Sequence, residues 1–291
     1  MRTRKLTELL PFVAPVHVLI LSVIVLPALY VAWLSLMESS FGQAPSFVGF
    51  DNFIRVLSDP SFRSALWNTV VLVVVAVHVE LLLGLLLALL FASGLPFRRV
   101  LLVCTLAPYA VSEVIAVVSW RYLFDPQAGP VTQLLLSLGL PVLDWSFEPV
   151  HAMILIAMLT IWLHLPFTFI ILYAARLAIP GDLYEAARID GARPWQAFRR
   201  VTLPMLGPAI VVALLFRYIF AFRIFSEVWL LTGGGPARTT EVVAVYLYRE
   251  AFTYNAFGTA AATAWIMVLA SLLLALGYVL VLRKQVTGNA H

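Results

Sequence analysis

The sequence predicts an all-α protein that crosses a membrane six times. Of the 291 residues, 62% are hydrophobic and only 12% are charged, and the apolar residues fall into six long runs. The mean hydropathy is +0.97. A soluble domain carries about 25% charged residues, so the excess apolar surface must face lipid. This composition excludes a soluble enzyme, a disordered protein and a nucleic-acid-binding protein, although the isoelectric point is near 9.4.

The six apolar runs are each long enough for a transmembrane helix, which needs about 20 residues. In chain order we expect these helices at 12–37, 65–93, 100–124, 150–175, 205–231 and 257–282. The first run exceeds the roughly 7–15 apolar residues of a secretory signal, so we expect it to remain as a helix.

Basic residues are distributed unevenly between the two sides of these runs. Twelve lie on the side of the termini and five on the opposite side. The twelve are Arg2, Arg4, Lys5, Arg98, Arg99, Arg176, Arg188, Arg193, Arg199, Arg200, Arg283 and Lys284. Because Lys and Arg concentrate in cytoplasmic loops, we expect both termini in the cytoplasm.

The first polar segment on the opposite side is expected to contain a short helix. Phe50, Phe53, Val56 and Leu57 precede Asp59 at a spacing that places apolar side chains on one face. Such a pattern is typical of a helix that lies in the membrane interface.

The loop at 176–204 contains a second short helix with marked ends. Asp182 is a suitable N-cap, Glu185 completes a capping-box pattern and Gly191 is suited to end the helix. These residues predict a helix over 183–190, about 12 Å long at 1.5 Å per residue. Pro194 suits the first turn of a following helix.

A helix of this length is marginal alone in water and needs a partner surface. Ala186 and Ala187 would let that surface approach the backbone closely. The partner could be the helical bundle of the same chain or another protein.

The residues of this loop resemble the EAA motif of the permease subunits of bacterial binding-protein-dependent ABC importers. Glu185-Ala186-Ala187 is followed after three residues by Gly191, after nine more by Val201, and then by Leu203-Pro204. The motif has Ile where this chain has Val201. Three further segments, 47–53, 120–126 and 231–236, resemble the sugar-permease branch of this family, which includes the maltose and glycerol-3-phosphate transporters.

This resemblance implies the transmembrane domain of a type I ABC importer. Residues 1–63 would form the first helix and the first extracytoplasmic loop, 64–282 a five-helix core with its coupling loop at 180–204, and 283–291 a cytoplasmic tail. The coupling helix of such a permease docks on an ATPase. The residues that the resemblance assigns to this contact are Glu185, Ala186, Ala187, Asp190 and Gly191.

The resemblance also implies the partners and the location. A second homologous permease, two copies of a cytoplasmic ATPase subunit and an extracytoplasmic solute-binding protein would complete the importer in the bacterial cell membrane. ATP and Mg²⁺ would bind the ATPase, so no cofactor is expected in this chain.

The sequence contains no motif of an enzyme. Thr232-Gly-Gly-Gly-Pro lacks the Gly-Lys-Ser/Thr of a phosphate-binding loop, and the histidines are scattered. The single cysteine, Cys104, excludes a disulfide within the chain and a thiolate zinc site. We therefore expect no catalytic, cofactor-binding or metal-binding residue.

Charged residues inside the spans mark a pathway or a paired site, because each costs about 2.5–3.5 kcal/mol at the bilayer centre. There are six: Glu80, Glu113, Arg121, Arg217, Arg223 and Glu227. In a continuous fifth span, Arg223 and Glu227 would be four residues apart on one face and could pair.

Aromatic side chains mixed with a few charged ones suit a sugar, whose ring faces stack while its hydroxyls need donors and acceptors. We expect the pathway to be lined by Glu113, Trp120, Arg217, Arg223, Glu227 and Trp229. A structural role remains open: Arg223–Glu227 could hold span five to its neighbours, Glu80 could pair with span three, and Arg217 could contact the partner permease.

Two alternatives to a sugar importer remain at this point. In the first, Arg217 and Arg223 clamp the phosphate of glycerol-3-phosphate or a glycerophosphodiester in an importer of the same kind. In the second, the chain is an ion-coupled secondary carrier with Glu80 or Glu113 as its ion site. The carrier leaves the EAA motif unexplained, and no inverted repeat is detectable.

Overall fold

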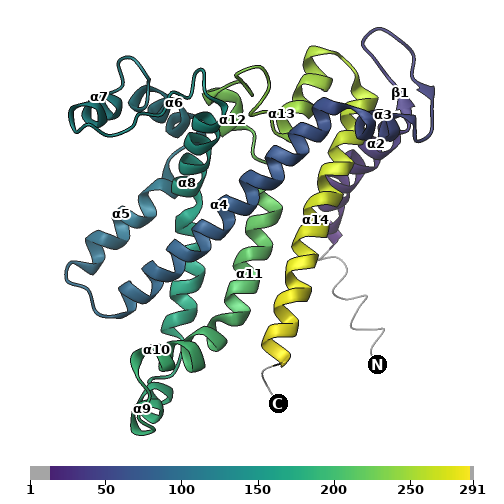
Figure 1. The fold of residues 1–291 in the computed structure, drawn as a ribbon. Helices are drawn as coiled ribbons and strands as arrows, with labels where there is room; N and C mark the ends of the chain where they lie inside the picture. Colours follow the sequence, from purple (N-terminus) through teal and green to yellow (C-terminus); the bar gives the residue numbers. More distant parts are fainter. Residues whose placement is uncertain (1–13, 289–291) are drawn as a thin grey trace, which may run out of the picture. The chain divides into compact units, whose positions relative to one another are not determined.

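The computed structural model describes residues 14–288, which are mostly helical (Figure 1). Residues 1–13, which include Arg2, Arg4, Lys5 and the start of the first expected span, lie outside the described part. Within it, the chain forms two compact units. One runs to Phe62 and includes Tyr246–Met267, and the other comprises Arg63–Val245 and the chain from Val268 onward.

The first unit begins with an apolar helix and a short hairpin. The helix extends over Ala14–Ser35, and the structure divides its second part into η1 (Leu21–Val25) and α2 (Leu26–Ser35). Strands β1 (Met37–Glu38) and β2 (Ser46–Phe47) pair antiparallel, with Met37 opposite Phe47.

Helix α3 (Asp51–Ser58) confirms the short helix predicted before Asp59. Its buried Asn52 donates hydrogen bonds to the carbonyls of Ser35 at 3.0 Å and Met37 at 2.8 Å. Ser35 is the last residue of α2 and Met37 is the first of β1, so Asn52 binds the backbone where the chain leaves the first helix. The place of α3 in a membrane interface stays a prediction.

Gly258, near the start of α14 (Phe257–Gly288), is required by close backbone packing in the same unit. A Cβ atom there would lie 2.0 Å from the carbonyl oxygen of Met37. Only glycine allows the two segments to approach so closely.

The second unit contains most of the helices, both long and short. In chain order these are α4 (Pro60–Ala92), α5 (Arg98–Ala110), α6 (Glu113–Leu123), α7 (Pro130–Ser137), α8 (Pro149–Leu177), α9 (Gly181–Ile189), α10 (Pro194–Ala197), η2 (Phe198–Thr202), α11 (Leu203–Ala221) and α12 (Ser226–Leu231). Helix α13 (Val243–Tyr248), η3 (Arg249–Thr253) and α14 complete the chain. Helix α8 lies between α5 and α11 (Figure 1).

Apolar side chains from α4, α6, α8 and α12 meet in the core of this unit. Its fully buried members include Leu72, Val117, Leu155, Leu159 and Val228. A second cluster joins α4 to α8 through Ala88, Phe91, Phe169 and Leu172. Gly84 lets these two helices approach, because a Cβ there would lie 3.3 Å from the backbone nitrogen of Phe169.

Five helices in the described residues are long and apolar enough to cross a membrane. They are Ala14–Ser35, Pro60–Ala92, Pro149–Leu177, Pro194–Ala221 and Phe257–Tyr278. Together with the bent pair α5 and α6 they give the six spans that the sequence predicts.

The third expected span is not a continuous helix. Helices α5 and α6 meet at an angle of 101°, and Val111 and Ser112 between them have extended backbones. Pro108 lies three residues before the bend and lacks the N–H that continues a helix. The prediction of one straight helix over 100–124 is therefore wrong.

The fifth expected span is also interrupted. It begins earlier than predicted, because a continuous helix runs over Pro194–Ala221, and it ends before Phe222, with α12 starting at Ser226. No proline or glycine lies between α11 and α12. The prediction of one helix over 205–231 is therefore wrong.

Candidate functional site

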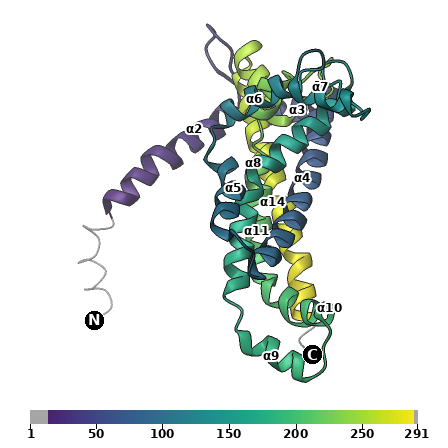
Figure 2. The same ribbon diagram turned by 90° about the vertical axis from the view of Figure 1, so that its left-hand side faces the viewer.

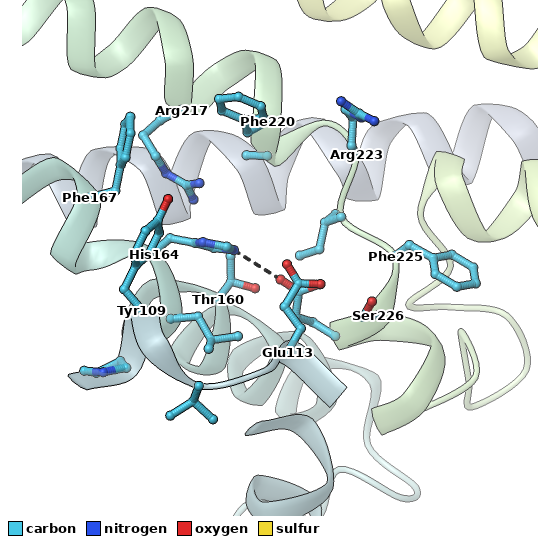
Figure 3. Close-up of a pocket in the computed structure, with 16 residues that line it drawn as sticks. Tyr109, Glu113, Thr160, His164, Phe167, Arg217, Phe220, Arg223, Phe225 and Ser226 are labelled. Carbon is cyan, nitrogen blue, oxygen red and sulfur yellow. Dashed lines mark hydrogen bonds and ion pairs between the residues drawn. The ribbon is translucent and has the colours of Figure 1, made fainter. Parts of the chain in front are cut away.

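A cavity of about 450 Å³ lies in the second unit, where both broken spans change direction. Helices α5, α6, α8, α11 and α12 contribute its walls. The lining residues are Pro108, Tyr109, Val111, Glu113, Thr160, Leu163, His164, Phe167, Arg217, Phe220, Ala221, Arg223, Ile224, Phe225, Ser226 and Glu227 (Figure 3). Its volume lies in the range of small-molecule sites in proteins.

The ion pair between Glu80 of α4 and Arg217 of α11 lies at one wall. Arg217 donates from Nε to one carboxylate oxygen at 2.5 Å and from Nη2 to the other at 2.8 Å. The side chain of Glu80 is 0% exposed and that of Arg217 is 4% exposed. This two-point geometry neutralises the guanidinium and ties α4 to α11.

A second buried contact joins α8 to α12. His164 Nε2 lies 3.4 Å from Glu227 Oε1, and Glu227 is 4% exposed. This contact holds the start of α12 against α8 and accounts for the position of Glu227 away from α11. Of these four side chains, Arg217, His164 and Glu227 line the cavity, whereas Glu80 does not.

The predicted pair of Arg223 and Glu227 does not form. The break after Ala221 separates the two residues, so they do not share a helical face. Arg223 is exposed and has no ion-pair partner among the described residues. Figure 3 shows its guanidinium pointing away from His164.

One of the two other structural alternatives is wrong, because Glu80 pairs with α11 rather than with span three. A contact between Arg217 and the partner permease stays a prediction, and within this chain Arg217 is bound to Glu80.

Four of the six predicted pathway residues line the cavity, namely Glu113, Arg217, Arg223 and Glu227. Glu113 is the first residue of α6, and its carboxylate faces the same space as the imidazole of His164 (Figure 3). Trp120 and Trp229 do not line it. Trp120 stacks on Phe124 at 5.2 Å between ring centroids, and Trp229 stacks on Phe225 at 5.9 Å.

Sequence reasoning missed the contribution of α8. Thr160 and His164 are four residues apart and line the cavity from one face of this helix. The hydroxyl of Thr160 is buried and has no hydrogen-bond partner in the described chain. Two polar residues four positions apart within the apolar run 150–175 could have indicated a polar face on this helix.

Aromatic rings form the other missed part of the wall. Tyr109, Phe167 and Phe220 line the cavity, and the rings of Tyr109 and Phe167 are 6.4 Å apart. The cavity thus combines apolar ring surfaces with the acceptors Glu113 and Glu227. This combination suits a ligand with both C–H faces and hydroxyl groups.

Helix α9 lies beyond the ends of α8 and α11, opposite to α6 and α7 (Figure 2). It extends over Gly181–Ile189 with Pro180 as its N-cap, so the predicted capping box of Asp182 and Glu185 does not form. Proline has no backbone N–H and is tolerated at the start of a helix but not in its interior, so the helix begins directly after Pro180.

The end of α9 agrees with the prediction. Gly191 has φ of +74°, its N–H bonds the carbonyl of Arg188 at 3.0 Å, and the N–H of Ala192 bonds that of Ala187 at 2.9 Å. This is a Schellman ending, which uses glycine.

No residue of α9 is buried in the described chain. Glu185, Ala186 and Asp190 are exposed, and Ile189 is 87% exposed. A short helix that buries so little of its own surface lacks the packing that usually stabilises helices. The surface carrying these residues is therefore available to a partner.

Comparison with known proteins gives a consistent result. Residues 80–286 match the family model of the binding-protein-dependent transport system inner membrane component. The trehalose/maltose transport system permease protein MalF of Thermococcus litoralis is 36% identical over 247 residues, which are 84% of this chain and 82% of the relative. The sulfoquinovosyl glycerol transport system permease protein SmoG of Agrobacterium fabrum is 34% identical over 279 residues, 94% of this chain and 89% of the relative.

A solved structure has the same fold. It is a chain of a bacterial ABC transporter involved in the import of the acidic polysaccharide alginate, with a TM-score of 0.85 and 24% sequence identity. The match covers 98% of this chain and 99% of that one.

Proposed function

The chain belongs to the family of binding-protein-dependent transport system inner membrane components, and we propose that it forms part of the translocation pathway of an importer for a neutral sugar. As a member of this family it is a membrane-embedded permease subunit of an ABC transporter and not an enzyme. The sugar, the pathway residues and the partners belong to the proposal.

The charge arrangement of the cavity is the observation that carries the choice of a neutral sugar. Arg217 is neutralised by Glu80, and Arg223 is exposed. The carboxylates of Glu113 and Glu227 remain on the wall, together with the unpaired hydroxyl of Thr160. Such a wall accepts hydrogen bonds from sugar hydroxyls, and its two carboxylates outnumber Arg223, the one lining guanidinium without an ion-pair partner in the described chain, so its charge disfavours an anion.

The same arrangement disfavours glycerol-3-phosphate and glycerophosphodiesters. The phosphate clamp considered from the sequence uses Arg217 and Arg223 together, and Arg217 is already bound to Glu80 through two hydrogen bonds. The names of the relatives include a neutral disaccharide and a sulfonated sugar, so the substrate is inferred from the cavity rather than from them.

Helix α9 is proposed as the contact to the ATPase. Its exposed Glu185, Ala186 and Asp190, together with Ala187 and the turn at Gly191, offer a small-residue surface that the described chain leaves uncovered. ATP and Mg²⁺ then bind the ATPase, and the side of the membrane that carries α9 is the cytoplasm.

The remaining partners follow from the same proposal. A second homologous permease closes the cavity. Two copies of the ATPase bind on the side of the membrane that carries α9, and an extracytoplasmic binding protein delivers the sugar. The exposed apolar faces of the long helices then contact lipid or the second permease.

Uptake by the reconstituted importer tests this proposal. Vesicles containing the chain with its co-purifying subunits and ATP are offered maltose, trehalose, glycerol-3-phosphate or an alginate oligosaccharide. We expect ATP-dependent uptake of a neutral sugar. Uptake of glycerol-3-phosphate or the acidic oligosaccharide in preference to every neutral sugar would contradict the substrate class, and uptake without ATP would contradict the importer.

A further inference from the structure

A second groove, of about 580 Å³, lies at the end of the second unit that carries α9. Its walls come from the C-terminal part of α4, the last turn of α8, α9 and the segment of α10 and η2. Arg176, Tyr184 and Trp195 line it, together with Leu86 of α4 and Ser93, the residue after α4. None of these residues lines the cavity described above.

Arg176 is the charged residue of this groove. Its guanidinium carbon lies 4.6 Å above the ring centroid of Tyr184, and the hydroxyl of Tyr184 is held by Thr202 Oγ1 at 2.9 Å. The Nε of Arg176 is buried and has no hydrogen-bond partner, and no carboxylate of the described chain pairs with it. A partly buried guanidinium without an anion is costly, so this position favours a negatively charged ligand.

The rest of the groove is apolar and continuous with the exposed face of α4. Leu86 is 62% exposed and Trp195 is 68% exposed. Leu86 and Ala92, which both line the groove, are six residues apart, about 9 Å along α4. The groove therefore has apolar residues of α4 at one end and the guanidinium of Arg176 at the other. Trp195 also lines it, and tryptophan is common at the interface between membrane and water.

We propose that this groove binds an anionic phospholipid, with Arg176 holding the phosphodiester and Leu86 and Trp195 contacting the adjoining apolar part. The planar guanidinium matches two phosphate oxygens. The charge of Arg176, which no carboxylate of the described chain neutralises, favours a headgroup with net negative charge. The bound lipid would connect α9 and α10 to α4 and α8, a role beyond that of the sugar pathway.

Lipid retention by the full chain tests this proposal. The importer is purified with its co-purifying subunits, incubated with phosphatidylglycerol or phosphatidylcholine and examined by native mass spectrometry. We expect selective retention of phosphatidylglycerol by the wild type and about tenfold weaker binding by Arg176→Gln, which is the loss expected from a charge-assisted hydrogen bond. Arg200→Gln is the matched control, since it removes the same charge from an exposed site outside the groove, and it should retain the lipid.

A second variant keeps the test decisive if Arg176→Gln does not fold. Ser93→Asp places a carboxylate at an exposed position on the groove and should also abolish the selectivity for phosphatidylglycerol.

Three results would overturn the proposal. The first is equal retention of the two lipids by the wild type, or equal loss in Arg176→Gln and Arg200→Gln. The second is displacement of the lipid by millimolar inorganic phosphate, which would identify a soluble-anion site. The third is loss of the co-purifying ATPase from Arg176→Gln with lipid binding unchanged, which would identify an acidic protein side chain as the partner.

Discussion

Removing the carboxylate of Glu80 should destabilise the protein strongly. Glu80→Gln leaves Arg217, which is 4% exposed, without its counter-ion. Breaking a buried pair by removing one partner costs about 3–5 kcal/mol, mainly because the other charge stays buried. Replacing both residues, as in Glu80→Gln with Arg217→Met, should recover most of this loss, since no unpaired charge then remains.

An exposed ion pair of the same chain provides the control. Arg55 Nη2 lies 3.7 Å from Glu38 Oε1 with both side chains 57% exposed, so Glu38→Gln should change stability by less than about 1 kcal/mol. Unfolding of each variant is followed in detergent by circular dichroism and by near-ultraviolet fluorescence. If Glu80→Gln costs no more than Glu38→Gln, or if the double variant is less stable than Glu80→Gln alone, the reasoning about the buried pair is refuted.

Three further substitutions follow from individual contacts. Thr160→Val should leave thermal stability unchanged or slightly raised, because the hydroxyl has no partner in the described chain. It should nevertheless raise the KM of sugar uptake, and an unchanged KM would remove Thr160 from the pathway. Gly191→Ala should cost about 1–2 kcal/mol of local backbone energy, since φ is +74° and a Cβ meets nothing within 4 Å. Sugar-stimulated ATP hydrolysis should then fall while sugar binding persists, and full hydrolysis would argue against α9 as the coupling contact. Gly258→Ala should abolish accumulation of folded protein, because its Cβ would lie 2.0 Å from the Met37 carbonyl oxygen. Gly277→Ala, whose Cβ meets nothing within 4 Å, should not, and immunoblots of membranes compare the two variants.

The long helices were predictable because a run of apolar residues is itself the requirement for crossing a bilayer. Helices α4, α8 and α14 begin and end within a few residues of the predictions, or extend them. The end of α9 was predictable as well, since a left-handed residue after a helix calls for glycine, and Gly191 provides it.

The two interruptions differ in what the sequence contains. The bend between α5 and α6 has a local signal, because Pro108 disfavours a continuous helix. The length of the apolar run nevertheless favoured the prediction of one span. The break between α11 and α12 has none, because it depends on contacts with residues distant in the chain. Arg217 meets Glu80, 137 residues away, and Glu227 meets His164, 63 residues away.

These distant contacts also explain the mixed outcome for the candidate site. Glu113, Arg217, Arg223 and Glu227 were found because charged residues are conspicuous in an apolar span. Which of them pair, and which face the cavity, depends on how the helices pack, and spacing along one helix could not show it. Trp120 and Trp229 share helical faces with cavity residues in sequence, but they pack on other aromatic rings instead.

Protection of a cavity cysteine by the transported sugar tests the central claim most directly. Ser226→Cys, which lines the cavity, is introduced together with Cys104→Ser, and its reaction with a small uncharged maleimide is timed with and without the sugar. The exposed Ser146→Cys, outside the cavity, is the control. We predict that the sugar slows labelling at 226 and leaves labelling at 146 unchanged. Equal labelling of 226 with and without a sugar that the importer transports would contradict the assignment of this cavity to the pathway.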